Sequence, residues 1–150
     1  MSQFSNNPLP VGQAVARTAG HTLQLDLKHE VWLITLRGVV TEVSALEACA
    51  AVERLIAAKG PWAGIADLSA IEKADISGES VRFLAARRPV APTGRLCILV
   101  APQDVIYGLS RMFQILRDQI GSDLQIAHTL EEAFALLGLE SPDFEAVDFG

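Results

Sequence analysis

Residues 64–69 read GIADLS and residues 75–78 read DISG, and between them the pattern changes from strand to helix. The first run is apolar, has the length of a strand and ends at Asp67, as expected of a strand that is covered on both faces. A short polar connection follows, and a helical pattern opens at Ser77, a residue type favoured at helix N-caps. These residues predict a strand, a polar turn and a helix in close succession.

Strand and helix patterns alternate along the rest of the chain. Residues 21–28 alternate apolar and polar side chains and residues 31–37 are nearly all apolar, so their short link predicts an antiparallel hairpin that Gly38 ends. The further strands are predicted over 62–68, 95–101 and 124–127, and the helices over 41–59, 77–88, 103–120 and 129–137. This ββαβαβαβα order predicts a single α/β domain with a mostly parallel sheet and an antiparallel edge hairpin.

Helix starts carry recognisable capping residues. Thr41 precedes Glu42, so a hydroxyl cap and a first-turn carboxylate both favour a helix start there. Thr129 and Glu132 have the spacing of a capping box, in which each side chain satisfies an exposed backbone amide. The predicted helix over 103–120 is closed by Gly121.

The predicted domain spans residues 21–138. Residues 1–20 are polar and contain Pro and Asn, which predicts a flexible N-terminal tail. Residues 139–150 form an acidic C-terminal segment that is either a tail or docks through its apolar side chains, which are Phe144, Val147 and Phe149. A chain of 150 residues with 50% hydrophobic residues is long enough to bury a core without metals or disulfides.

Charge and hydropathy exclude several classes of function. The net charge of −6 opposes a nucleic-acid surface, which needs clustered Lys and Arg, and it also opposes an anionic membrane surface. The longest apolar run, residues 96–102, is far shorter than the ~20 residues of a membrane helix. No secretory signal is recognisable at the start of the chain. We therefore expect a soluble cytoplasmic protein.

Residues with metal-binding or catalytic potential do not form a recognisable motif. Cys49 and Cys97 lie in apolar segments and are predicted to be reduced core residues. His21, His29 and His128 lie far apart, without the paired spacing of a metal site. No nucleophile elbow, phosphate-binding loop or Cys-x-x-Cys pair is present. The prediction is a non-catalytic protein without a cofactor.

The sequence Asp-Leu-Ser at residues 67–69, followed by Asp-Ile-Ser-Gly at residues 75–78, resembles the STAS domain of bacterial anti-anti-sigma factors, the SpoIIAA-like proteins. In that family a strand ending in Asp-Leu-Ser is followed at this distance by Asp-Ser-Ser-Gly, and a partner kinase phosphorylates the second serine. The resemblance spans about residues 23–137 and implies that Ser77 is a phosphorylation switch. It places Asp67, Asp75 and Gly78 around that switch.

The second half of the chain adds a narrower resemblance. Residues 100–102 (VAP) and 107–113 (YGLSRMF) are similar to the SpoIIAA-like branch that is grouped with CRAL-TRIO-type lipid-binding proteins. This resemblance implies a small apolar or lipid-like ligand, held between the sheet and the helix over 103–120. Tyr107, Met112 and Phe113 are the residues expected to line such a cavity, although apolar residues at helical spacing are also typical of a plain core.

Each candidate site has an alternative structural interpretation. A phosphate on Ser77 would add about −1.5 to −2 charge near a helix N-terminus, but the same serine is explained as a cap that contributes ~1 kcal/mol. Asp67 and Asp75 are either a carboxylate pair or side chains bonded to local amides. Three arginines precede Pro89 and are candidate ligands for an anion: Arg82, Arg87 and Arg88. Arg87 and Arg88 are as well explained as favourable charges at a helix end.

Two functional hypotheses follow from these patterns. One is a regulatory module that binds a regulatory protein or kinase and is switched by phosphorylation of Ser77. The other is a carrier or sensor of a small apolar ligand. A homodimer is also expected, because an edge strand over residues 21–28 can pair with a copy of itself.

Overall fold

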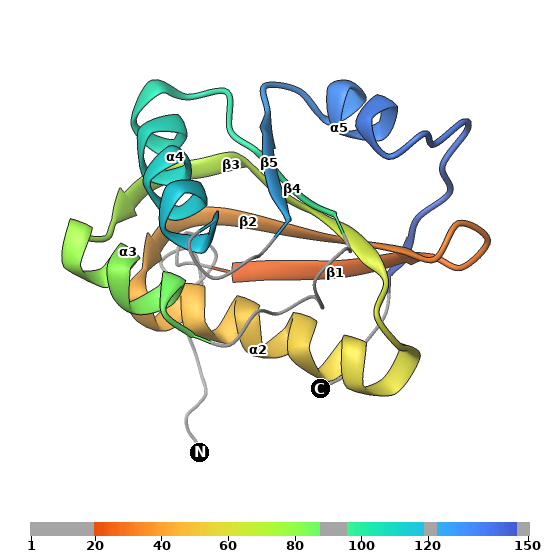
Figure 1. Ribbon diagram of the computed structural model, residues 1–150, viewed down its shortest axis with the longest axis horizontal. Helices are drawn as coiled ribbons and strands as arrows, with labels where there is room; N and C mark the ends of the chain where they lie inside the picture. Colours follow the sequence, from red (N-terminus) through yellow and green to blue (C-terminus); the bar gives the residue numbers. More distant parts are fainter. Residues whose placement is uncertain (1–19, 88–95, 119–122, 147–150) are drawn as a thin grey trace, which may run out of the picture.

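The computed structural model describes residues 20–87, 96–118 and 123–146, which form a six-stranded mixed sheet with helices on both faces (Figure 1). Along the chain the elements are β1 (Gly20–Asp26), β2 (Val31–Thr41), α2 (Glu42–Lys59), β3 (Ala63–Asp75), α3 (Gly78–Ala85), β4 (Cys97–Val100), α4 (Asp104–Asp118), β5 (Leu124–Ala127), α5 (Leu130–Leu136) and β6 (Glu145–Ala146). The strand order across the sheet is β5-β4-β3-β2-β1-β6. The predicted α/β class and the predicted order of the first nine elements are confirmed.

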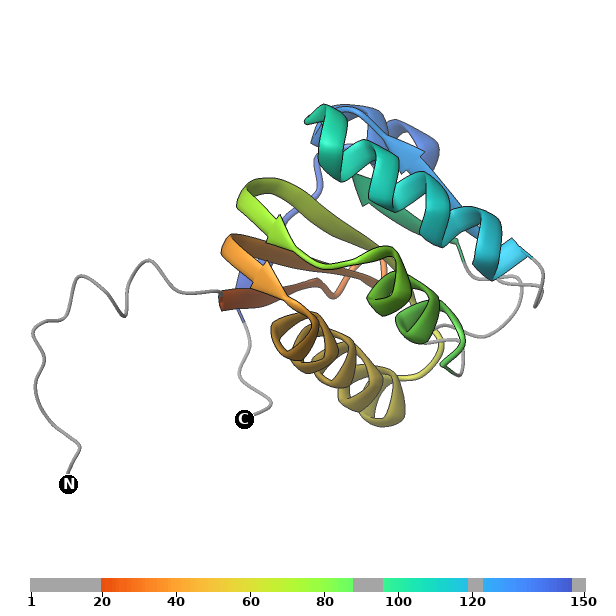
Figure 2. The ribbon, with the colours of Figure 1, turned by 90° about the vertical axis from the view of Figure 1, so that its left-hand side faces the viewer.

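The sheet combines an antiparallel edge with a parallel centre. β1 pairs antiparallel with β2, whereas the pairs β2–β3, β3–β4 and β4–β5 are parallel. Helices α2, α3 and α4 pack on one face, with α3 between α2 and α4 (Figure 2), and α5 packs on the other face. This arrangement separates the buried residues into two clusters, one on each side of the sheet.

Two predicted strand ends are wrong. β2 continues through Gly38, and β3 continues past Asp67 to Asp75, so the polar connection expected after Asp67 is a strand. The two strands pair from Arg37 with Ala70 to Thr41 with Asp75, beyond the end of β4. The backbone N–H and C=O groups of the two strands hydrogen-bond to each other, so the strands continue through residues with polar side chains that show no apolar pattern. Gly38 has a φ of 78°, which glycine adopts without strain, and lies at a register shift.

Helix boundaries follow the capping residues closely. Thr41 accepts a hydrogen bond from the Ser44 amide and the Ser44 hydroxyl accepts one from the Thr41 amide, which fixes the start of α2. At α5, Thr129 accepts from the amide of Glu132 as predicted. The Glu132 carboxylate instead accepts from the amide of His128, so the predicted reciprocal capping box is wrong in that half.

One helix is shorter than its apolar pattern indicates, because α3 begins after the cap Ser77 and ends at Ala85 rather than at residue 88. α4 begins at Asp104 rather than at residue 103, and it is described as far as Asp118. Arg88 and the predicted helix end at Gly121 lie outside the described residues, as does the N-terminal tail up to residue 19.

The C-terminal segment docks over its described part. β6 pairs antiparallel with β1 at Gln24 and Leu25, and the Phe144 ring stacks on Phe134 with ring centroids 6.0 Å apart. Val147 and Phe149 lie outside the described residues. β6 therefore occupies part of the edge through which a homodimer was predicted. Self-association stays a prediction, and among the described strands β6 pairs with β1 at Gln24 and Leu25 alone.

The polar face predicted for β1 is wrong at Asp26. Its side chain is 1% exposed, whereas Leu27, predicted to face inward, is 55% exposed. Asp26 accepts hydrogen bonds from the backbone amide and ring Nδ1 of His29 and from the amide of Asp143, at 3.0, 2.7 and 3.1 Å. The carboxylate thus ties the hairpin turn to the C-terminal segment.

Candidate functional site

A cavity of about 220 Å³ lies between the sheet and helices α2, α3 and α4. Its walls come from the faces of β2 and β3 that contact these helices and from the inner sides of the three helices. Apart from Arg87, Ser110 and Arg117, every lining side chain is hydrophobic. A space with this lining and size is suited to a small apolar molecule rather than to water, which needs polar partners.

Small side chains create this space. Ala45 and Ala48 on α2 face Ala66 and Ala74 on β3, and all four line the cavity. A helix and a sheet pack at a distance set by their larger side chains, so four alanines leave volume that nothing fills. The Ala-rich pattern of residues 42–59 is the sequence signal for this cavity.

The cavity has one apolar end and one cationic end. The strands from β2 to β5 are parallel, so their carboxyl ends lie at the same edge of the sheet. Ile71 and Ala74, toward the carboxyl end of β3, line the apolar end of the cavity. Cys97 and Leu124 open β4 and β5 at the opposite end. The helices return toward that second end, and there Arg87 follows α3 and Arg117 lies in the last turn of α4.

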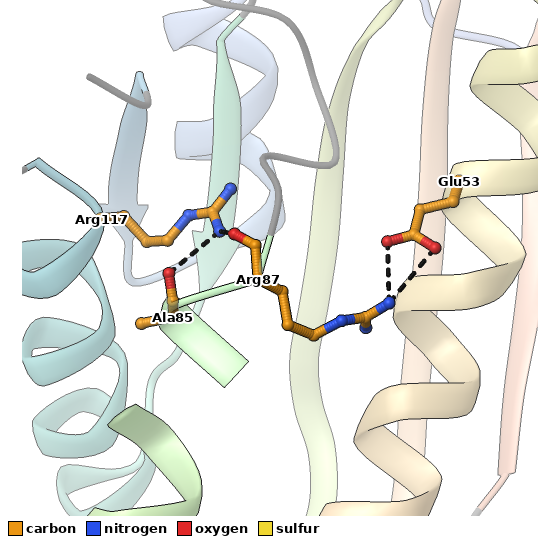
Figure 3. Close-up of polar contacts among 4 residues, drawn as sticks. All are labelled: Glu53, Ala85, Arg87 and Arg117. Atoms are coloured by element: carbon orange, nitrogen blue, oxygen red, sulfur yellow. Dashed lines mark hydrogen bonds and ion pairs between the residues drawn. The ribbon is translucent and has the colours of Figure 1, made fainter. Parts of the chain in front are cut away.

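Arg117 is a buried cation. Its side chain is 5% exposed, and Nη1 donates hydrogen bonds to the carbonyls of Ala85 at 3.2 Å and Arg87 at 2.8 Å (Figure 3). Its guanidinium carbon lies 5.6 Å from the centroid of the Phe113 ring. No carboxylate among the described residues lies within ion-pair distance of it. Burial lowers the pKa of the Arg117 guanidinium, which still stays protonated at neutral pH.

Arg87 joins this cationic end to α2. Its Nη2 donates to both oxygens of Glu53, at 3.3 and 3.0 Å, and Figure 3 shows the pair bridging toward α2. Its Nη1 is buried and has no hydrogen-bond partner among the described residues. The two arginines and the one glutamate leave this end of the cavity with one positive charge that no described carboxylate balances.

The two cysteines also line the cavity, and burial disfavours their thiolate forms. Neither forms a disulfide, as predicted, and each is half-buried because it borders the cavity. Burial raises the pKa of the Cys49 thiol and raises that of Cys97 to about 12. Both thiols are therefore protonated at neutral pH, and the reactive thiolate form is scarce.

The three residues predicted to hold a ligand have different surroundings. Phe113 lines the cavity, whereas Tyr107 and Met112 do not. The Tyr107 ring stacks on His128 with centroids 5.0 Å apart. Met112 lies against the start of α3, because a Cβ on Gly78 would be 3.1 Å from the Met112 methyl group.

Arg87 was predicted from the sequence as a candidate anion ligand, whereas Arg117 was not predicted. The signal for Arg117 was its position on the apolar face of α4, four residues after Phe113 and seven after Ser110, where a charge is unexpected. Arg82 lies in the last turn of α3 and does not line the cavity.

Ser77 is an exposed helix cap. Its Oγ accepts from the Ser80 amide at 3.1 Å and donates to the Ser80 hydroxyl at 3.2 Å. The Ser80 hydroxyl in turn donates to Glu42 on α2 at 2.5 Å. The start of α3 is thus tied to the start of α2, and Ser77 is accessible at this junction.

Asp67 and Asp75 are not a pair. They lie eight residues apart on one strand, which at ~3.3 Å per residue separates them by roughly 25 Å. Asp67 accepts from the amide and hydroxyl of Ser69, and Asp75 is exposed near Ser77. Asp67 therefore does not contribute to the surface formed by Asp75, Ser77 and Gly78.

Within the described ranges, no three His, Cys, Asp or Glu side chains gather in a way that could hold a metal ion. None of the described helices has the length and apolarity needed to cross a membrane.

No family model matches the chain, and no curated protein matches its sequence. Among solved structures, the chain is similar to the crystal structure of an anti-sigma factor antagonist from Mycobacterium paratuberculosis. The alignment has 18% identity and a TM-score of 0.49 and covers 80% of this chain and 96% of that chain.

Proposed function

We propose that the protein is a non-catalytic regulatory module that responds to a small apolar molecule bound beneath α3. The observation that carries this proposal is the apolar cavity of about 220 Å³ between the sheet and α2, α3 and α4. Pockets for small molecules have this character, with hydrophobic walls and a few polar groups that orient the ligand.

The cost of an empty cavity supports an occupant. A closed, unfilled apolar cavity costs about 24 cal/mol per Å³, so roughly 5 kcal/mol is the upper bound for a volume of about 220 Å³. A typical domain has a total stability of only ~5–15 kcal/mol. A ligand that fills the space would recover much of this free energy and would stabilise the folded state in proportion to its affinity.

The lining also favours binding over catalysis. Its polar side chains are two arginines and Ser110, and both of its thiols are protonated. General acid–base or nucleophilic chemistry would need a carboxylate, an imidazole or an activated nucleophile beside the ligand.

A bound ligand can be sensed outside the cavity through α3. Val81 and Leu84 of α3 line the cavity, and the same eight-residue helix begins at the exposed cap Ser77. Exposed apolar side chains lie near this junction, Val43 next to Glu42 on α2 and Phe83 on α3. A ligand that shifts α3 would therefore alter a surface suited to a regulatory protein partner.

Filling the cavity with a side chain tests the proposal. Ala66→Leu adds three carbons on the cavity wall, and at ~0.8 kcal/mol per buried CH₂ it is expected to raise the free energy of unfolding by up to about 2 kcal/mol. The same variant is expected to lose binding of 1-octanol, followed through the fluorescence of Trp32, which lines the cavity.

Ala70→Leu is the matched control, because Ala70 lies on the same strand but is exposed and outside the cavity. This control should bind 1-octanol like the wild type. Equal binding by Ala66→Leu and the wild type would place the ligand elsewhere and overturn the proposal.

A second function, a phosphorylation switch at Ser77, is supported by the exposed hydroxyl and by its link through Ser80 to Glu42. The positive N-terminus of α3 would attract a phosphate on Ser77. The nearby carboxylates of Glu42, Asp75 and Glu79 would repel it. Phosphorylation would accordingly loosen the link between α3 and α2.

Substitutions at Ser77 separate capping from charge. Ser77→Ala should cost ~1 kcal/mol in urea unfolding and leave the fold intact, because the cap to the Ser80 amide is lost. Ser77→Asp should keep most of that stability, since Asp also caps helices, while it mimics the added charge. Protein purified from its own host should carry a covalent phosphate at Ser77. A bare covalent mass throughout growth would contradict the switch.

A further inference from the structure

We infer that the ligand is an anionic amphiphile, a short-chain or medium-chain carboxylate whose head pairs with Arg117 and whose chain runs along the cavity. This inference rests on the proposed function, because it assigns the chemistry of the molecule that the cavity holds.

The first support is the uncompensated charge of Arg117. Arg117 is 5% exposed and lines a cavity whose other walls are almost entirely hydrophobic. Among the described residues only its Nη1 donates hydrogen bonds, and both go to uncharged carbonyls. Buried charges in proteins are normally paired with an opposite charge. A carboxylate on the ligand would supply that charge.

The second support is the position of Arg87 at the same end. Arg117 donates to the Arg87 carbonyl at 2.8 Å, and the side chains of both arginines line the cavity. Glu53 balances one of the two positive charges, and the buried Nη1 of Arg87 has no described partner. A ligand with one negative charge would neutralise this end, and its planar carboxylate matches the fork of a guanidinium.

The size of the cavity sets the length of the chain. An engineered apolar cavity of ~150 Å³ holds benzene, so about 220 Å³ accommodates roughly eight carbon atoms. From the arginines such a chain would extend between α3 and β3 toward the apolar end at Ile71 and Ile76. Octanoate therefore has both the head and the chain that the site requires.

The test compares ligands of equal chain length and different charge. Calorimetric titration of the wild-type protein at pH 7 should show octanoate binding about tenfold tighter than 1-octanol, as a charge-assisted pair with Arg117 would give. Acetate, which has the charge but no chain, should bind far more weakly than octanoate.

Arg117→Met assigns the effect to one side chain, because methionine keeps an unbranched apolar stem and removes the charge. We expect this variant to bind octanoate about tenfold more weakly than the wild type and to lose the preference for octanoate over 1-octanol. Arg111→Met removes an exposed arginine of the same helix and should change neither affinity. If Arg117→Met fails to fold, the octanoate to 1-octanol ratio of the wild type decides by itself.

The outcomes separate this inference from the proposed function. Wild-type protein that binds 1-octanol as tightly as octanoate would overturn the anionic ligand and leave the apolar cavity site standing. Acetate binding as tight as that of octanoate would overturn the inference that the apolar chain of the ligand occupies the cavity. Binding of neither octanoate nor 1-octanol would overturn the inference and the proposed function together.

Discussion

Replacement of Gly64 by alanine is expected to lower the free energy of unfolding by about 3 kcal/mol. A Cβ at this position would lie 1.8 Å from Cε2 and 2.0 Å from Cδ2 of the Trp32 ring. Gly64 and Trp32 are paired residues of β3 and β2, so neither backbone can retreat without breaking the centre of the sheet. The ring is 2% exposed and is held by a hydrogen bond from its Nε1 to the carbonyl of Trp62.

Urea unfolding followed by circular dichroism measures this effect, and Gly108→Ala is its control. Gly108 is an exposed residue within α4, and a Cβ there meets nothing within 4 Å. That substitution should stabilise the protein by about 0.5–1 kcal/mol, because alanine is the better helix former. A Gly64→Ala variant as stable as the wild type would show that the Trp32 ring does not cover this glycine.

Asp26→Asn should lower the free energy of unfolding by about 2–3 kcal/mol at neutral pH. The Asp26 carboxylate is 1% exposed and accepts from the His29 amide, the His29 ring and the Asp143 amide. An asparagine side chain would place its NH₂ group, which only donates, against at least one of these donors, and that hydrogen bond would be lost. Asp143→Asn is the control, because Asp143 contributes only its backbone amide and its own side chain is exposed.

The pH dependence of stability identifies the same carboxylate. Burial alone would raise the pKa of Asp26, but the hydrogen bonds from His29 and Asp143 outweigh it and hold this pKa below its ordinary value. A carboxylate with a lowered folded-state pKa stabilises the protein fully above its unfolded pKa of ~3.9 and loses this effect as the pH falls through the folded value. Unfolding titrations between pH 7 and pH 3 should therefore show the gap between wild type and Asp26→Asn narrowing below about pH 4. A gap that stays constant would contradict an ionised, hydrogen-bonded Asp26.

The parts of the fold that the sequence predicts are those with a local signal. Alternation of apolar and polar residues predicts the hairpin of β1 and β2, and helical spacing predicts the helices that follow the strands. Capping residues predict the start of α2 at Thr41. The end of β3 has no such signal, because Glu72 and Lys73 continue the strand only by pairing with β2. β6 is two residues long and is likewise defined by its partner, β1.

The candidate site shows the same division between local and distant information. Ser77 could be predicted as a helix cap from its neighbours. The wide separation of Asp67 from Asp75 depends on an unmarked strand, and the role of Arg117 depends on which face of α4 covers the cavity. Tyr107 and Met112 share the apolar stripe of α4 with Phe113, and the stripe does not distinguish residues that contact a void from residues that contact other side chains.

A ligand in the cavity is tested most directly by native mass spectrometry of protein purified from its own host, run beside a denatured spectrum of the same sample. We predict an excess mass that is present only in the native spectrum, because the ligand is held without a covalent bond. We also predict that Ala66→Leu lowers this excess, since its three added carbons occupy part of a cavity that accommodates roughly eight. A wild-type protein that has its bare mass in the native spectrum, and keeps it after addition of octanoate or 1-octanol, would contradict a ligand-binding cavity.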